Sequence, residues 1–295
     1  MQVAPSAPSP RRAIKPRSPS FDFDSVPKHW LGGNAVATHM ANGLNLLFPE
    51  GERFFVDSVA RFRDRIDDPA LLARVRGFAA QEVMHSKEHA ALNALVEALG
   101  AKRMDELGRD VAALLGRARR LRSPKEQLAI TCALEHITAI LGEQLLTDEA
   151  HRAMLHESVR NLWAWHALEE CEHKDVAFDV YEAVGGTYFT RVTQMALATF
   201  GLFVFIGRAH LLLLHERGLL SDLPLLARTV DYLWLRRGLF RALVPRYLAY
   251  YRRGFHPSDL DTRALVDGWR ERLFGERGEL RGTLDAASRK EKKAA

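Results

Sequence analysis

The chain has 295 residues, of which 47% are hydrophobic and 27% charged, so it can form a globular core and is neither disordered nor fibrous as a whole. The formal net charge at pH 7 is only +5, and no basic stripe interleaved with aromatic residues is visible, so we expect no nucleic-acid partner. The two cysteines, Cys132 and Cys171, have neither zinc-ligand spacing nor a disulfide pattern. These features favour a cytoplasmic protein.

The two ends of the chain differ in composition from the rest. Residues 1–25 are rich in Pro, Ser and Arg, which predicts a disordered N-terminal tail. The first 20 residues lack the apolar region of a secretory signal, so we do not expect a signal peptide. At the other end, we expect residues 276–295 to fray.

Between the ends, apolar residues recur at intervals of three and four, the period of an α-helix, and no stretch alternates as a strand does. The first predicted helix starts near Asn34, is kinked at Pro49 and ends near residue 66. The second starts at the cap signal Asp68-Pro69 and ends at Leu99.

Two further long helices are predicted after a loop or short helix over residues 100–122. One starts at the cap signal Ser123-Pro124 and covers residues 124–148. The other covers residues 152–184 and ends at Gly185-Gly186. Long helices with short connections are typical of an antiparallel bundle, so we predict an all-α fold with a four-helix bundle over residues 26–186.

A C-terminal helical extension is predicted over residues 187–275. Residues 195–206 are almost continuously apolar, but these 12 residues are fewer than the roughly 18 that a membrane span needs. We expect a buried helix here. The alternatives are a hairpin that lies on a membrane surface through residues 195–214, or the wall of a channel for an apolar substrate. Further helices are expected over about 222–254 and 258–274.

Two Glu-x-x-His units carry the strongest chemical signal, Glu82/His85 in the second long helix and Glu170/His173 in the fourth. Three residues advance a helix by about 300°, so both side chains of a unit lie on one face and can bind one metal ion. A di-iron or di-manganese carboxylate bundle uses two such units and a lone Glu from each of the other two helices. The sequence therefore predicts a two-metal site.

The two lone carboxylates are also present. Glu52 shares its helix face with apolar residues, and Glu135 follows an apolar stretch in which an unpaired carboxylate is costly to bury. Glu50 remains an alternative to Glu52, and Glu143 an alternative to Glu135. Glu169 could replace Glu170 only if His173 were not a ligand.

Two further histidines lie on the same faces of the two helices. His89 follows His85 by four residues, and His166 precedes Glu170 by four residues. Each is a candidate extra ligand or a hydrogen-bond donor to a ligand. The alternative is a polar residue at the edge of the bundle.

The sequence also resembles a bacterial family of predicted metal-dependent hydrolases over about residues 14–260. The resemblance rests on these segments: FPEGERFF (48–55), QEVMHSKEH (81–89), LEHITAILGEQLL (134–146), WHALEECEHKDVAFDVYEAVGG (165–186) and GFHPSD (254–259). It implies a ferritin-like fold with the same ligands. The ligand pattern is also similar to that of di-iron oxygenases and oxidases, such as the ribonucleotide reductase small subunit.

Three functions are compatible with this site. We expect an oxygen-dependent di-iron oxygenase or oxidase that acts on an apolar or lipid-like small molecule, because a Glu- and His-rich site within helices suits iron or manganese. The alternative is a hydrolase that uses water activated by two metal ions. The third is a non-catalytic metal-binding or redox protein.

The expected cofactor is a pair of metal ions, with iron as the first choice and manganese, a mixed Mn/Fe pair or zinc as alternatives. An oxidising reaction would also need an electron-donor protein. A homodimer and a peripheral contact with a membrane are left open.

Overall fold

The computed structural model describes residues 13–235 and 238–284. Within these ranges every regular element is a helix, and the backbone pairing of Leu31 with Leu155 is an isolated bridge. The predicted all-α class is therefore confirmed. The helices are α1 (Ala35–Asn45), α2 (Phe48–Ala60), α3 (Pro69–Ala98), α4 (Met104–Leu121), α5 (Pro124–Thr147), α6 (Glu149–Arg152), α7 (Glu157–His173), α8 (Val176–Ala183), α9 (Tyr188–Glu216), α10 (Leu223–Trp234), α11 (Leu239–Ala249) and α12 (Arg263–Phe274).

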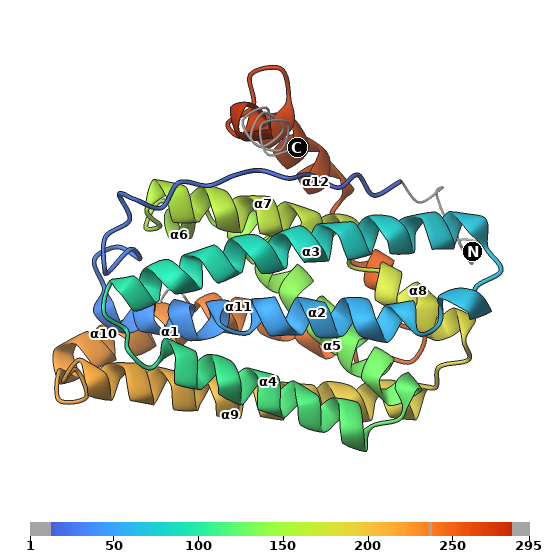
Figure 1. Ribbon diagram of the computed structural model, residues 1–295, viewed down its shortest axis with the longest axis horizontal. Coiled ribbons are helices and arrows are strands. Elements are labelled where there is room, and N and C mark those ends of the chain that lie inside the picture. Colours follow the sequence, from blue (N-terminus) through green and yellow to red (C-terminus); the bar gives the residue numbers. More distant parts are fainter. Residues whose placement is uncertain (1–12, 236–237, 285–295) are drawn as a thin grey trace, which may run out of the picture.

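Helices α2, α3, α5 and α7 pack against one another around a shared core. Figure 1 shows α2 and α3 side by side along the length of the molecule, with α7 beside α3. The predicted N-terminal caps of α3 and α5 are present. The Asp68 carboxylate accepts a hydrogen bond from the backbone N–H of Ala70, and Ser123 forms a capping box with Glu126.

The first predicted helix is two helices. The chain turns after Asn45 and restarts as α2 at Phe48, so that Pro49 occupies the first turn of α2, where its missing N–H costs nothing. Helix α2 ends at Ala60, earlier than expected. The segment 100–122, for which we expected a loop or a short helix, contains the 18-residue helix α4.

The fourth predicted helix is also divided, into α6, α7 and α8. No proline or glycine marks the break after His173. Instead Arg74 on α3 forms ion pairs with Asp175 and with Asp179, 2.6 Å from Nη1 to the Asp179 oxygen. The Lys174 ammonium donates to Thr262 Oγ1 at 3.0 Å. These tertiary contacts explain why the chain bends where its local sequence favours a continuous helix.

The N-terminal segment is ordered where the structure describes it, so the expected tail is wrong for residues 13–25. The segment runs along α3 and α7 (Figure 1). Ile14 approaches α3 so closely that a Cβ at Gly77 would lie 2.7 Å from the Ile14 Cβ. Arg17 is buried against Glu169 and Glu172 of α7. Residues 1–12 lie outside the described residues.

The C-terminal end also differs from the expectation. Residues 276–284 pack back on α12, because Leu280 is buried and its N–H donates to the carbonyl of Leu273 at 2.8 Å. Residues 285–295 of the predicted frayed segment lie outside the described residues.

Helix α9 is the largest departure from the sequence-based expectation. It has 29 residues. An 18-residue stretch within it has a mean hydropathy of 1.9, and only 22% of that stretch is buried. The expectation of a buried helix over residues 195–214 is therefore wrong. By length and composition alone α9 could cross a membrane. Its buried side, which includes Met195, Ala209 and Leu213, packs on α5 and α1.

Candidate metal centre

The six predicted ligands come together in the middle of the bundle. All are buried to 3% exposure or less. Helix α2 supplies Glu52, α3 supplies Glu82 and His85, α5 supplies Glu135, and α7 supplies Glu170 and His173. Each helix presents these residues inward because its apolar neighbours on the same face form the core.

Glu170 lies at the centre of the group. Its Oε1 atom is 3.4 Å from His173 Nε2 and 3.7 Å from His85 Nδ1. His173 Nε2 also lies 3.0 Å from Glu82 Oε1 and 3.5 Å from Glu135 Oε2. Thr138 on α5 donates to the other oxygen of Glu170, which leaves Oε1 facing the histidines.

His166 completes a second group of possible ligands. Its Nε2 atom lies 2.9 Å from Glu170 Oε1 and 3.9 Å from Glu52 Oε1. The ligand atoms of Glu52, His85 and His166 fall within 4.8 Å of one another, and so do those of Glu82, Glu170 and His173. The two groups meet at Glu170, so the arrangement provides two adjacent positions for metal ions with one carboxylate between them.

A chain of hydrogen bonds orients the ring of His166. The amide N–H groups of Asn45 donate to the carbonyl of His89 and to Asn93 Oδ1, so the Asn45 oxygen faces His89 Nδ1 at 2.6 Å. His89 therefore donates through Nδ1, and its Nε2 accepts from His166 Nδ1. The Nε2 atom of His166 is left to face the carboxylates, 2.9 Å from Glu170 Oε1. His89 thus positions His166 and is not itself a ligand.

The other two histidines are held in the same manner. His173 Nδ1 contacts Gln81 Oε1 at 2.9 Å, and the Gln81 amide donates to Glu172 Oε2 at 3.1 Å. On the other side, His85 Nε2 contacts Glu169 Oε2 at 3.1 Å. Each imidazole therefore contacts an outer partner through one nitrogen and directs its other nitrogen toward the centre, the arrangement that metal-binding histidines adopt.

Many of the inward-facing atoms have no hydrogen-bond partner among the described residues. They are both carboxylate oxygens of Glu52, Glu82 and Glu135, together with His85 Nδ1 and His173 Nε2. Buried polar atoms are nearly always paired, and unpaired carboxylates are especially costly to bury. Such atoms, close together but not aligned for hydrogen bonds, fit a shared cation.

The electrostatics of the site point the same way. Burial raises the pKa of Glu52 and of Glu135 well above the usual value, and the neighbouring charges of Glu82 and Glu170 raise it further. Burial lowers the pKa of His173, but Glu170 and Glu82 outweigh it and raise that pKa overall. Without a metal ion, protons must therefore supply the positive charge that the carboxylates require.

Two divalent cations would balance this site, since four carboxylates carry four negative charges and neutral imidazoles add none. Mixed nitrogen and oxygen donors suit iron, manganese or zinc. The residues present therefore fit a pair of divalent metal ions. The complete set of candidate ligands is Glu52, Glu82, His85, Glu135, His166, Glu170 and His173.

The structure separates the alternative candidates from this centre. Glu143 forms an ion pair with Arg246, whose Nε donates to Glu143 Oε2 at 2.8 Å. Glu50 pairs with Arg53 at the surface. Glu169 faces His85 Nε2 from outside the centre, so its place is to orient that ring.

Sequence reasoning did not single out Gln81, Asn45, Thr138 or Arg17. Gln81 directly precedes the first motif, and Asn45 is a polar residue at the end of an apolar helix, but neither pattern is specific. Arg17 gave no signal, because it lies in a segment that we expected to be disordered.

Aromatic rings surround the histidines. The ring of Phe48 lies 4.6 Å from that of His166, Phe78 lies 5.0 Å from His173, and Trp165 lies 4.8 Å from His85. These rings exclude water from the sides of the centre and hold the imidazoles in place.

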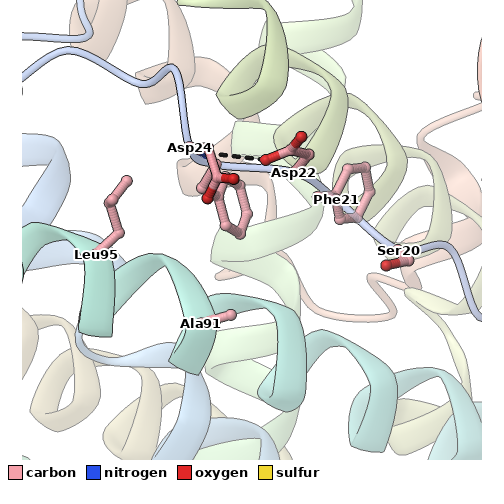
Figure 2. Close-up of a pocket in the computed structure, with 7 residues that line it drawn as sticks. Ser20, Phe21, Asp22, Asp24, Ala91 and Leu95 are labelled. Atoms are coloured by element: carbon pink, nitrogen blue, oxygen red, sulfur yellow. Dashed lines mark hydrogen bonds between the residues drawn. The ribbon is translucent and has the colours of Figure 1, made fainter.

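A hollow of about 550 Å³ lies nearby, between the N-terminal segment and α3. In Figure 2, Ala91 and Leu95 on α3 face the segment that contains Phe21, Asp22 and Asp24. The ring of Phe21 lies 5.6 Å from that of Trp165, which in turn contacts His85. Two aromatic side chains thus separate this hollow from the candidate ligands.

Comparison with known sequences agrees with the metal-binding chemistry of the site. Residues 15–261 match a family described as "predicted metal-dependent hydrolase". This range includes all seven candidate ligands. Comparisons with curated proteins and with solved structures gave no match.

Proposed function

Because the chain belongs to the family of predicted metal-dependent hydrolases, we propose that it is an enzyme that holds two divalent metal ions and catalyses a hydrolysis. One observation carries the two-metal part of this proposal. Three buried imidazoles direct one ring nitrogen each toward four buried carboxylates, most of whose oxygens lack a hydrogen-bond partner among the described residues.

A bound pair of divalent cations supplies a water of lowered pKa and polarises a carbonyl or phosphoryl oxygen. The chain's own residues fix the geometry. Thr138 holds one oxygen of Glu170, while Gln81 and His89 fix the tautomers of His173 and His166. Glu52 and Glu135 each have both oxygens unpartnered among the described residues and a raised pKa, so these two carboxylates are the best suited to accept a proton.

The substrate needs a route to this buried centre. We propose that it enters from the hollow beside Phe21, which is half-buried, and that the rings of Phe21 and Trp165 form the last barrier. The apolar side chains that line the hollow favour a substrate with an apolar part, and its acidic side chains favour a polar or cationic group. The lining residues are Ser20, Phe21, Asp22, Phe23, Asp24, Ala91 and Leu95. Replacing Phe21 by Ala should then lower KM for bulky substrates while leaving metal content unchanged.

The second candidate reaction is oxygen-dependent oxidation of an apolar molecule, which we favoured from the sequence. The burial and the aromatic surroundings of the ligands favour it, because a hydrolase needs water at its centre. The family description favours hydrolysis and gives no support to oxidation.

The test is to load the purified protein separately with Zn²⁺, Mn²⁺ and Fe²⁺ and to measure bound metal by mass spectrometry. Hydrolysis of chromogenic esters and phosphoesters is then compared with oxygen uptake by the Fe²⁺ form. We expect two metals per chain and hydrolysis that is lost in Glu52→Gln. Oxygen uptake without hydrolysis would show that the reaction is the oxygen-dependent oxidation and not a hydrolysis. Failure to bind metal would overturn the whole proposal.

A further inference from the structure

Helix α9 presents a continuous apolar face to solvent. Its exposed large side chains recur at intervals of three, four, seven and eight residues, so they lie on one side of the helix. They are Phe189, Leu197, Phe200, Phe203, Val204 and Leu211, with exposed fractions from 42% to 69%. We call these six residues the α9 face. Figure 1 shows α9 along one long edge of the molecule.

A strongly basic segment adjoins the α9 face. In the described part of this segment, residues 217–235 and 238–253, there are six arginines and two aspartates, with no lysine or glutamate, and therefore a net charge of +4. The entire chain has a net charge of only +5. Helix α11 of this segment lies beside α9, because Tyr247 on α11 contacts Thr199 on α9 at 3.0 Å between their hydroxyl oxygens.

The basic segment is itself rich in exposed apolar side chains. Leu223, Val230 and Trp234 on α10, and Val244 and Leu248 on α11, are between 42% and 69% exposed. Arginines lie among them.

Three of these arginines have an exposed guanidinium. Arg228, Arg241 and Arg253 have no carboxylate partner among the residues that the structure describes. The guanidinium of Arg253 lies 5.9 Å from the ring of Phe189 on the α9 face.

We propose that the α9 face, together with residues 217–235 and 238–253, docks the protein on the surface of a membrane that contains anionic lipids. Apolar side chains enter the boundary between headgroups and acyl chains, and nearby arginines bind lipid phosphates. This proposal does not depend on the reaction catalysed at the metal centre.

The charge argues against a second copy of the chain as the occupant. A two-fold dimer through this face would bring together two segments whose described residues each carry a net charge of +4. A membrane span is also disfavoured, because the opposite side of α9 packs on α5 and α1. In addition, Arg208 on α9 forms ion pairs with Asp110 and Glu106 of α4, which a span would break.

The test uses the full chain, loaded with metal, in co-sedimentation with vesicles. One set contains phosphatidylcholine alone, and the other contains a third of phosphatidylglycerol. We expect binding to the anionic vesicles that weakens as salt is raised, and little binding to the neutral ones. The double variant Phe200→Ser/Phe203→Ser should bind at least about tenfold more weakly.

Two further variants test the contribution of the arginines and the specificity of the α9 face. Arg228→Gln/Arg241→Gln should reduce the salt dependence. Val83→Ser, which removes a 58% exposed side chain from α3, is the matched control and should bind as the wild type does. Thermal unfolding of each variant verifies that it is folded.

Three results would overturn the proposal. The first is no binding to either vesicle, and the second is binding that the phenylalanine variant retains. The third is a dimer in sedimentation velocity that Phe200→Ser/Phe203→Ser dissociates, since the face would then be an interface between copies of the chain.

Discussion

Arg17 and Glu169 form a buried ion pair that joins the N-terminal segment to helix α7, with Nη1 of Arg17 2.8 Å from Oε1 of Glu169. The other oxygen of Glu169 faces the candidate ligand His85 at 3.1 Å. Arg17 also donates to Glu172, which accepts from Gln81, the residue that orients His173. One arginine therefore supports two of the three candidate imidazole ligands from outside the centre.

Replacing Arg17 by Ala should destabilise the fold and weaken metal binding. Removal of one partner from a buried ion pair leaves an uncompensated charge, so we expect a loss of about 3 kcal/mol in urea unfolding. We also expect roughly tenfold weaker metal binding in a chelator competition. Arg53→Ala, which removes an exposed partner of Glu50, should change the free energy of unfolding by less than about 0.5 kcal/mol. Equal effects of both substitutions would contradict the structural role of Arg17.

The choice between candidate ligands can be tested by metal stoichiometry. His166→Ala should reduce the bound metal from about two ions per chain to about one, because His166 belongs to the group with Glu52 and His85. Glu143→Gln should still bind two ions, since Glu143 pairs with Arg246 instead. A loss of metal in Glu143→Gln with normal loading of His166→Ala would reverse our assignment.

Chelation should destabilise the protein more at pH 8 than at pH 5.5. A carboxyl whose pKa is raised in the folded state stabilises it fully below the ordinary pKa near 4.5, and that contribution is lost as pH rises. Glu52 and Glu135 are raised in this way by burial, so the metal-free protein should weaken toward alkaline pH. Bound metal ions replace those protons. We expect the melting temperatures with and without metal to differ by roughly 10 °C at pH 8. If metal changed the melting temperature equally at both pH values, the raised pKa values of Glu52 and Glu135 would not account for the effect of the metal.

His39 should contribute to unfolding in acid. Burial lowers its pKa to about 4, and the charges of Arg217, His29, His210 and Lys28 add to this effect. Its contribution to stability is present above pH 6.5 and is lost as pH falls toward 4, because only the unfolded state then binds the proton.

The free energy of unfolding should therefore fall less between pH 6.5 and pH 4 in His39→Gln than in the wild type, by about 2 kcal/mol in urea unfolding. The exposed His215 on α9 provides the control, and its substitution by Gln should leave the slope as in the wild type. An unchanged slope in His39→Gln would assign the acid transition to other groups.

The sequence by itself determined the all-α class, the starts of α3 and α5 and the inward-facing residues of the bundle. Asp68 and Ser123 placed the starts of α3 and α5, because a cap depends on a few adjacent residues. The Glu-x-x-His spacing placed each pair on one helix face for the same local reason. The order of these motifs along the chain then sufficed to predict that six side chains meet, as the structure has them.

Only the tertiary structure decided between neighbours with similar local patterns. Glu143 and Glu135 both occur on α5, but Arg246 from a distant helix pairs with Glu143. His89 and His166 were equivalent candidates until Asn45 fixed the proton on His89. Such choices depend on contacts between residues far apart in sequence, which periodicity does not encode.

The same reason explains the two largest departures from expectation. Arg17 is ordered because it pairs with Glu169 and Glu172 of α7. The sequence of residues 1–25 alone does not predict those partners. Helix α9 has the composition of a core helix, but only one of its sides finds a neighbour in the bundle. Composition sets how apolar a helix is, whereas the number of helices around it decides which of its faces is covered.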